Sequence, residues 1–399
     1  MINPRLPNLT YKGIPVWRHA QIIEWAAQIV SGVLVLALIA WFFSNIANAI
    51  SDRDIPFGFG FLGREYQTPI GQHFLPYESS DSFLYALAVG ATNTVFVSII
   101  GVVLATGLGV FIGVSRLSGN WLVSKIALVY IEFFRNVPLL VQLFFWFYIV
   151  LALPPVREGY DVGGVFYLNN AGLYLPMPTG NGVGPGLVWM GSVAVAVAAG
   201  VLVHKGLSRR EERTGSASYP LLTGVAATVI VGLVGWFVIT AAIGGYPLAI
   251  STPAPQGAFG RIDGGFELSG GLMALLTGLV MYTAAFIAEI VRAGIQSVGK
   301  GQAEASRSLG LSAIGTVRNV TFPQALRVIV PPTISQYLNL TKNSSLAAAI
   351  GYTDLTNVAK TMTQTAPAVS IFILIMGAYL AMSLTYSLIG NLYNRRIAF

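Results

Sequence analysis

Two short glycine-rich motifs in this sequence suggest nucleotide binding. The residues in and around each motif argue against that function. Residues 294–301 read GIQSVGKG, one residue short of a phosphate-binding P-loop, with Gly301 where a Ser or Thr must ligate Mg²⁺. An apolar helical segment precedes this motif instead of a strand. Residues 58–63 read GFGFLG and match GxGxxG, but no helix is expected after them. We therefore expect that the chain does not bind ATP by itself.

Metal-binding and nucleophilic chemistry have no better support. The chain has no cysteine, which excludes disulfide bonds, thiolate metal sites and cysteine nucleophiles. Its three histidines, His19, His73 and His204, are scattered, so no histidine metal site and no bound cofactor are expected. An enzyme would need a clustered acid, base or metal constellation, and the sequence offers none.

Polar side chains inside apolar runs are better candidates, because a charge in a membrane costs about 3 kcal/mol. Glu132 and Arg135 are three residues apart on one helix face. They could serve transport, or they could form an interfacial ion pair that braces a nearby loop. Gln142 follows seven residues after Arg135, on the same face, and could line a path. The aromatic cluster at 144–148 is expected to contact lipid and pack rather than stack on a substrate.

A second polar group lies in the run at residues 333–350. Gln336, Asn339 and Asn343 recur at i, i+3 and i+7 and so share one helix face, with Ser344 beside them. Lys342 lies about 100° round from Asn343, at the edge of this stripe. The stripe could form the wall of a polar cavity in which Lys342 favours the passage of a carboxylate. Alternatively, Lys342 is a structural residue neutralised by Glu132 or by backbone carbonyls.

Composition shows which elements must position these residues. The chain has 399 residues, of which 54% are hydrophobic and only 10% are charged. Soluble domains carry about 25% charged residues, so this is a membrane protein. We expect an all-α fold of about eight transmembrane helices, each near the 20 apolar residues that span a bilayer. The expected runs are 25–50, 82–115, 126–153 (bent at Pro138), 187–203, 219–243, 271–288, 333–350 and 369–389.

Charge in the connecting segments predicts the orientation. Alternate segments hold 16 Lys and Arg on one side and 5 on the other, whereas acidic residues run 5 against 10. Lys and Arg are retained on the cytoplasmic side. Both termini and residues 289–332 are therefore expected in the cytoplasm. The basic excess is expected to face lipid headgroups and a protein partner, not nucleic acid.

Residues 289–332 form a polar, basic loop between two apolar runs. Residues 302–309 can form a short helix that Gly310 ends, because glycine tolerates the left-handed C′ position. Ser312 is placed to cap a second short helix, and Pro323 is expected to close it. The loop is too polar to lie in lipid and is expected beside the membrane.

This loop resembles the signature loop of ABC importer permeases, whose pattern is E-A-A, three residues, Gly, nine residues, I-x-L-P. Gly310 falls at the required spacing, and three residues depart mildly from the pattern: Ser306 for Ala, Val320 for Ile and Phe322 for Leu. An ordinary basic loop is the alternative. The matching positions are Glu304, Ala305, Ser306, Gly310, Val320 and Pro323.

Residues 82–153 and 270–395 are similar to the polar amino-acid branch of this family. The extra first span in 1–81 and the insertion at 154–270 resemble the larger permease subunit of general L-amino-acid uptake systems. The resemblance implies a type I permease core over 82–395 in a bacterial inner membrane. It also implies a coupling loop at 289–332 that docks on a cytoplasmic ATPase dimer, which holds ATP and Mg²⁺.

A second related permease and a periplasmic amino-acid-binding protein complete the assembly that the resemblance implies. The expected function is amino-acid import by alternating access. Alternatives are a permease for another small polar solute or a secondary transporter. A secondary transporter would show inverted repeats and carboxylates at the midplane, and neither is found in the sequence.

Overall fold

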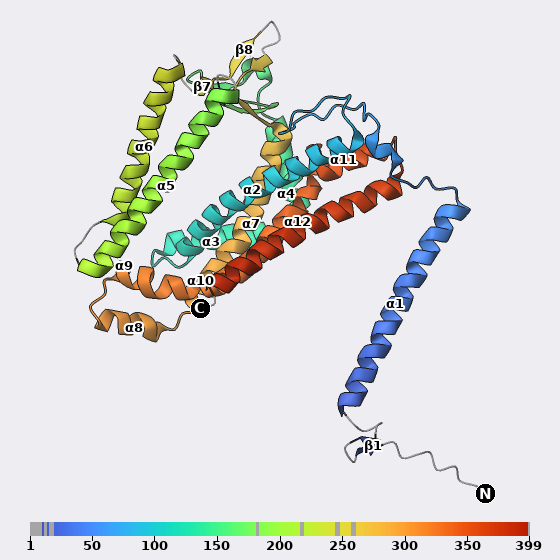
Figure 1. Cartoon of the computed structure of the whole chain (residues 1–399), viewed down its shortest axis with the longest axis horizontal. Coiled ribbons are helices and arrows are strands. Elements are labelled where there is room, and N and C mark those ends of the chain that lie inside the picture. The colour runs from blue at the N-terminus through green and yellow to red at the C-terminus, as the bar shows by residue number, and fades with distance from the viewer. Residues whose placement is uncertain are drawn as a thin grey trace.

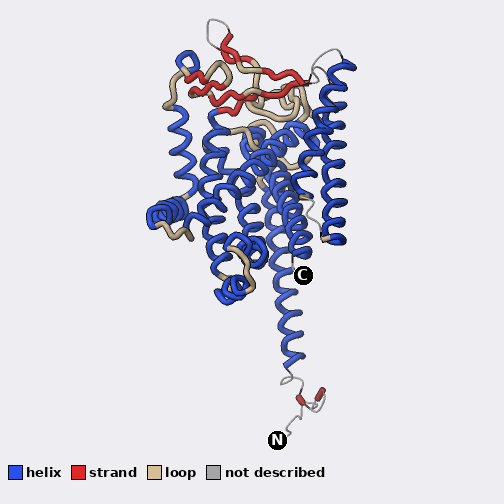
Figure 2. Tube along the Cα trace, turned by 90° about the vertical axis from the view of Figure 1, so that its left-hand side faces the viewer, coloured by secondary structure: helices blue, strands red, loops and turns tan. Residues whose placement is uncertain are grey.

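The computed structural model describes residues 10–11, 14–15, 20–180, 183–215, 219–243, 248–256 and 261–397. His19 and most of the N-terminal polar segment lie outside these residues. Long helices run roughly alongside one another, and the strands that follow residue 159 gather at one end of them (Figures 1 and 2). We call this the strand end of the molecule.

Helices dominate the described residues. They are α1 (Ala20–Asp52), α2 (Phe83–Arg116), α3 (Trp121–Asn136), α4 (Leu139–Leu151), α5 (Val183–Thr214), α6 (Pro220–Ile243), α7 (Gly270–Gln296), α8 (Lys300–Ser308), α9 (Ala313–Thr316), α10 (Phe322–Asn343), α11 (Leu355–Met362) and α12 (Ala368–Ile397). A π-helical turn (Val317–Thr321) joins α9 to α10, and a 3-10 turn (Ser344–Ala349) follows α10. Two shorter 3-10 turns are Gly60–Gly63 and Val156–Glu158.

Six of these helices are long and apolar enough to cross a membrane: α1, α2, α5, α6, α7 and α12. The pair α3 and α4, bent by 106° around Pro138, makes up to seven. The all-helical membrane fold is thus confirmed, with six or seven apolar spans instead of about eight. The difference is α10, which begins at Phe322 rather than Thr333 and is too polar to qualify.

Short strands are the feature of the insertion that the sequence analysis did not predict. They are β3 (Tyr160–Val162), β4 (Phe166–Asn169), β5 (Gly172–Leu175), β6 (Met177–Gly180), β7 (Leu248–Ser251), β8 (Ala254–Gln256), β9 (Arg261–Asp263) and β10 (Phe266–Ser269), besides β1 (Thr10–Tyr11) and β2 (Ile14–Pro15). β10, β5, β4 and β3 form an antiparallel sheet in that order. Because β5 pairs with β10, the two ends of the insertion meet next to α7.

The centre of the helical core is the contact between α2 and α7. Four small residues of α2, spaced four apart on one helix face, are buried: Gly101, Ala105, Gly109 and Gly113. A Cβ on Gly109 would lie 2.7 Å from the Ile287 Cβ, and one on Gly113 would lie 2.6 Å from the Ala288 carbonyl oxygen. Only glycine lets the two backbones approach this closely, as small residues do in other membrane helix pairs.

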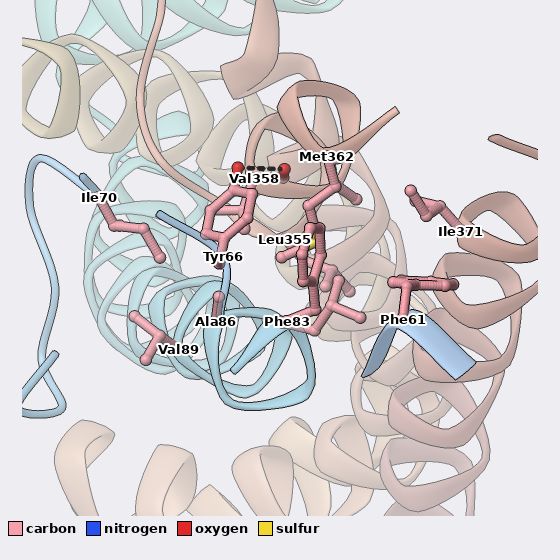
Figure 3. Close-up of a cluster of buried hydrophobic side chains, with 12 residues drawn as sticks. Phe61, Tyr66, Ile70, Phe83, Ala86, Val89, Leu355, Val358, Met362 and Ile371 are labelled. Carbon is pink, nitrogen blue, oxygen red and sulfur yellow. Dashed lines mark hydrogen bonds between the residues drawn. The ribbon is translucent and has the colours of Figure 1, made fainter. Parts of the chain in front are cut away.

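A second buried cluster lies at the strand end (Figure 3). Phe61 and Tyr66, from the segment before α2, pack against Phe83 at the start of α2. α11 and α12 complete the cluster, for example through Met362 and Ile371. The Tyr66 hydroxyl donates a hydrogen bond to the Val358 carbonyl oxygen of α11. These contacts hold residues 60–81 over the ends of the core helices.

α1 stands apart from the other helices and has no buried residue (Figure 1). It begins at the end where α8 lies, and α12 ends there too (Figure 1). Its apolar surface is exposed along the whole helix, as expected for a span that contacts lipid or a neighbouring subunit.

Gly109→Ala should loosen the α2–α7 contact and destabilise the protein by about 1–3 kcal/mol, because the added Cβ has no room. Gly107→Ala is the matched control, since nothing lies within 4 Å of its Cβ position. Thermal unfolding of the purified protein in detergent checks both. Equal melting temperatures for the two variants would show that the contact is not tightly packed.

Candidate functional site

Residues 300–321, which we call the elbow, project from the end of the helices opposite the strands (Figure 1). α8 ends at Ser308, and Gly310 follows with φ of +83°. The Gly310 amide donates to the Arg307 carbonyl oxygen at 2.9 Å, and the Leu311 amide donates to the Ser306 carbonyl oxygen at 3.1 Å. These bonds satisfy carbonyls at the helix end. The predicted stop of this helix at Gly310 is confirmed.

Ser306 joins the two halves of the elbow. Its side chain is 3% exposed, and its hydroxyl donates to the Ala303 carbonyl oxygen at 2.9 Å. The same oxygen lies 3.0 Å from the hydroxyl of Thr316, at the end of α9. The Ser that departs from the family's Ala is therefore a buried link between α8 and α9.

The second half of the elbow differs from the prediction. Ser312 caps α9, since its hydroxyl oxygen accepts from the Gly315 amide at 3.1 Å. Pro323 does not close this helix: the chain continues through the π-helical turn into α10, with Pro323 in its first turn. Proline is tolerated there because the first-turn amides lack intrahelical partners in any case. Glu289 to Gln296 also belong to α7, so the loop is shorter than 289–332.

The outer surface of the elbow carries apolar side chains. Leu309 is 83% exposed, and Val317 is also exposed, as is Phe322 at the start of α10. Glu304 and Ala305 lie on the exposed side of α8, whereas Val320 is half-buried. Leu311 is exposed as well, so several exposed apolar side chains lie on this otherwise polar projection.

Glu132 and Arg135 lie on α3 but do not pair with each other. The Asn136 amide group donates to the Glu132 carboxylate at 3.1 Å. The Arg135 guanidinium lies 5.3 Å from the centre of the Phe286 ring, within the range of a cation–π contact. Both residues are described, and the ion pair that was one of the two alternatives for them is absent; the contacts that the structure shows are with Asn136 and Phe286 instead. An ion pair found among the described residues joins Glu289 and Arg292 on α7.

Gln142 is buried at the bend between α3 and α4. Its amide nitrogen donates to the carbonyl oxygens of Phe134, at 3.0 Å, and Val137, at 2.9 Å. These carbonyls would otherwise lack partners because the helix breaks at Pro138. Gln142 therefore stabilises the bend and does not share a face with Arg135, since the 106° bend separates them.

The remaining candidates, the polar residues predicted to line the substrate path, lie on α10 and in the turn that follows it. Ser335, Asn339 and Lys342 are exposed at i, i+4 and i+7, so they form one polar stripe. Gln336 and Asn343 are half-buried beside it. The exposed face is therefore turned toward Lys342 relative to the predicted stripe of Gln336, Asn339 and Asn343. The described residues show no ion pair between Lys342 and Glu132.

Ser344 is buried just beyond this stripe. Its hydroxyl donates to the Thr341 carbonyl oxygen at 2.7 Å. The opposite face of α10, including Ile329 and Leu340, packs into the α2–α7 core. One side of α10 is therefore fixed in the protein while the other presents polar groups.

The relation to known proteins follows from sequence comparison. Residues 262–399 match the family described as binding-protein-dependent transport system inner membrane component. YhdX of Escherichia coli (strain K12), named as an amino-acid ABC transporter permease, is 41% identical over 399 residues, 98% of each chain. The general L-amino acid transport system permease protein AapQ of Rhizobium johnstonii is 39% identical over 93% of this chain and 91% of its own.

A third relative is BztB of Rhodobacter capsulatus, a glutamate/glutamine/aspartate/asparagine transport system permease protein. It is 37% identical over 93% of this chain and 92% of its own. The chain belongs to the ABC importer permease family. The resemblance seen in the sequence is confirmed, and this permease is a transport subunit rather than an enzyme.

The permease has a cavity of about 730 Å³ at its strand end, which the sequence analysis missed. Gln72 lies at its edge: its side chain donates to the Glu267 carbonyl oxygen at 2.6 Å and accepts from the Ser269 hydroxyl. The Gln72 carbonyl oxygen accepts from the amide of Asn93 at 2.8 Å and from the hydroxyl of Thr353 at 2.7 Å. Gln72 therefore ties three distant segments of the permease together.

Asp354 is the buried acid that the sequence analysis did not single out. It is 0% exposed and caps α11, where its carboxylate accepts from the Asn357 amide at 2.8 Å. The Tyr379 hydroxyl donates to its other oxygen at 3.2 Å. Burial raises the pKa of this carboxyl to about 6, although its hydrogen bonds oppose the rise. The sequence signal was an Asp directly before a short amphipathic helix.

Asp354 should make the stability of the permease depend on pH. Because the folded pKa lies above the unfolded value, the folded state holds the proton more tightly. The stabilisation of the folded state by this tighter proton binding is fully present below about pH 4 and is lost as pH rises through about 6; it amounts to about 3 kcal/mol. Asp354→Asn keeps a capping side chain and should flatten the melting temperature between pH 5 and pH 7. An unchanged pH profile in this variant would contradict the assignment.

Proposed function

We propose that this permease carries polar or general L-amino acids inward across the bacterial inner membrane, driven by ATP hydrolysis on a separate ATPase dimer. The single observation that carries the proposal is the continuity of α10 with the elbow. A helical stretch that starts in the projecting elbow continues as α10, which presents the polar stripe Ser335, Asn339 and Lys342. Movement of the elbow is thereby transmitted to the stripe.

Alternating access follows from this arrangement. The exposed apolar surface around Leu309 docks on the ATPase, which binds ATP and Mg²⁺. When ATP binding draws the two ATPase subunits together, the elbow moves with them, and α10 tilts against the α2–α7 pair. A second, related permease faces the polar stripe, so that the central cavity lies between the two subunits and opens alternately to each side.

The substrate class rests on the relatives and on the stripe. The three relatives described above are named for amino-acid transport. Every amino acid presents a carboxylate, whatever its side chain, and Lys342 supplies an exposed cation in the stripe. Hydroxyl and amide groups at Ser335 and Asn339 replace part of the water that a polar solute loses.

The elbow faces the cytoplasm in this proposal, and the strand end faces the periplasm. The basic excess of residues 289–332 and of both terminal segments supports this orientation. α1 begins and α12 ends on the same side as the elbow (Figure 1), which supports placing both termini in the cytoplasm. A periplasmic amino-acid-binding protein delivers the substrate at the strand end.

Gly310→Val should weaken association with the ATPase or uncouple ATP hydrolysis from uptake. At a φ of +83°, a Cβ costs about 1–2 kcal/mol, although no neighbour occupies the space. Gly301→Val is the matched control, because Gly301 lies inside α8 with equally open surroundings. Co-purification of the ATPase and uptake into vesicles measure the effect. Equal losses in both variants would indicate added bulk at the docking surface instead of the turn.

Lys342→Met should lower amino-acid uptake at least tenfold while the complex still assembles and hydrolyses ATP. Lys360→Met, which removes an exposed cation from α11, should retain uptake. Radiolabelled uptake into proteoliposomes tests both, with several amino acids and one unrelated polar solute. Loss of assembly in Lys342→Met, restored by adding Glu132→Gln, would make Lys342 structural. Uptake of only the unrelated solute would assign a different substrate class.

A further inference from the structure

The hairpin of α5 and α6 is a part of the permease to which the transport mechanism gives no role. The two helices pack against each other and lie apart from α2, α7 and α12 (Figure 1). They touch at Gly200 and Gly224: a Cβ on Gly224 would lie 2.9 Å from both the Gly200 carbonyl oxygen and the His204 Cβ. The hairpin is therefore a closely packed unit whose outer surface faces away from the core.

A groove of about 240 Å³ lies between the two helices of this hairpin, and Gly200 and Gly224 are among its lining residues. Val197 and Val201 of α5 form one wall, and Leu221 and Val225 of α6 form the other. His204 lies at the end that faces the α5–α6 turn. The walls are apolar along their length, and the groove opens toward the space that lipid occupies, because these valines and Leu221 are exposed.

Two basic residues of α5, Lys205 and Arg209, continue the line of the valines that form one wall of the groove. Val197, Val201, Lys205 and Arg209 recur every four residues, so they lie along one side of α5. Lys205 and Arg209 are exposed, at the point where the apolar span of α5 ends at Glu211. Long basic side chains at such a position reach the level of the lipid headgroups. Residues 205–213 hold four basic and two acidic residues, so their net charge is +2.

We propose that the groove and these two cations bind one anionic phospholipid. One acyl chain lies against the valine wall, where it fills a space that side chains leave empty, and the phosphate group lies between Lys205 and Arg209. A neutral lipid would fill the groove equally well but gain nothing from the cations. The basic end lies on the same side of the molecule as the elbow (Figure 1), so the lipid belongs to that leaflet. This site does not depend on which solute is transported.

The test uses the complete transporter in nanodiscs that contain phosphatidylglycerol and phosphatidylcholine. Native mass spectrometry counts the phospholipids of each kind that remain bound. The parent protein should retain phosphatidylglycerol selectively. The double variant Lys205→Gln, Arg209→Gln should lose about fivefold of this selectivity for each cation removed, or about 25-fold in total. Val201→Trp should displace the lipid by filling the groove with the charges intact.

Arg210→Gln is the matched control, because Arg210 lies about 100° round the helix from Arg209 and carries the same charge. It should keep the parent's selectivity. Equal loss in this variant, or unchanged retention in Val201→Trp, would overturn the site. Displacement of the lipid by millimolar inorganic phosphate would show that the site binds only an anion and does not recognise a phospholipid. Loss of the ATPase from the double variant, with lipid selectivity intact, would assign this basic end to protein docking.

Discussion

The close contact between α2 and α7 is the interaction on which the rest of the permease depends. Lipid tails are as apolar as leucine, so helices in a membrane gain little from burying apolar surface and associate through close packing. Gly109 and Gly113 let the backbones of α2 and α7 approach each other. α7 then contacts α3, α4 and α10 with its remaining faces. Each of these elements is therefore positioned relative to the α2–α7 pair.

A second constraint explains why α10 carries an exposed polar stripe. A helix with so many polar side chains is poorly suited to lipid, which offers them no hydrogen-bond partners. One face of α10 avoids lipid because Ile329 and Leu340 pack into the core. The hydroxyl of Thr333 has a hydrogen-bond partner within the helix, the Ile329 carbonyl oxygen. The other face, with Asn339 and Lys342, must face water or another subunit. The polar side chains make α10 unfavourable in contact with lipid. The same side chains make it suitable for the wall of the proposed cavity.

Local signals in the sequence were reliable where a single residue type determines the backbone. Gly310 ends α8, Ser312 caps α9 and Pro138 breaks the third span, as predicted. Expectations failed where the partner could not be inferred from helical periodicity. Gln142 bonds to carbonyls freed by the bend, and a strand at 172–175 pairs with one at 266–269. The prediction for Pro323 failed for a different reason. Proline breaks a helix when it lies in the interior but is favoured in the first turn, and the sequence alone did not distinguish these two positions.

The sheet also explains how the permease accommodates so large an insertion. Because β5 and β10 pair beside α7, the chain leaves and re-enters the core at nearly the same place. Within the part of the chain that the structure describes, the four buried clusters contain no residue of α5 or α6. The hairpin is thus constrained by its own glycine contact and by the membrane around it, not by the core. A row of cations that continues a groove wall is not needed to fold such a hairpin. Its position at the end of an apolar span is where long basic side chains reach the level of lipid headgroups.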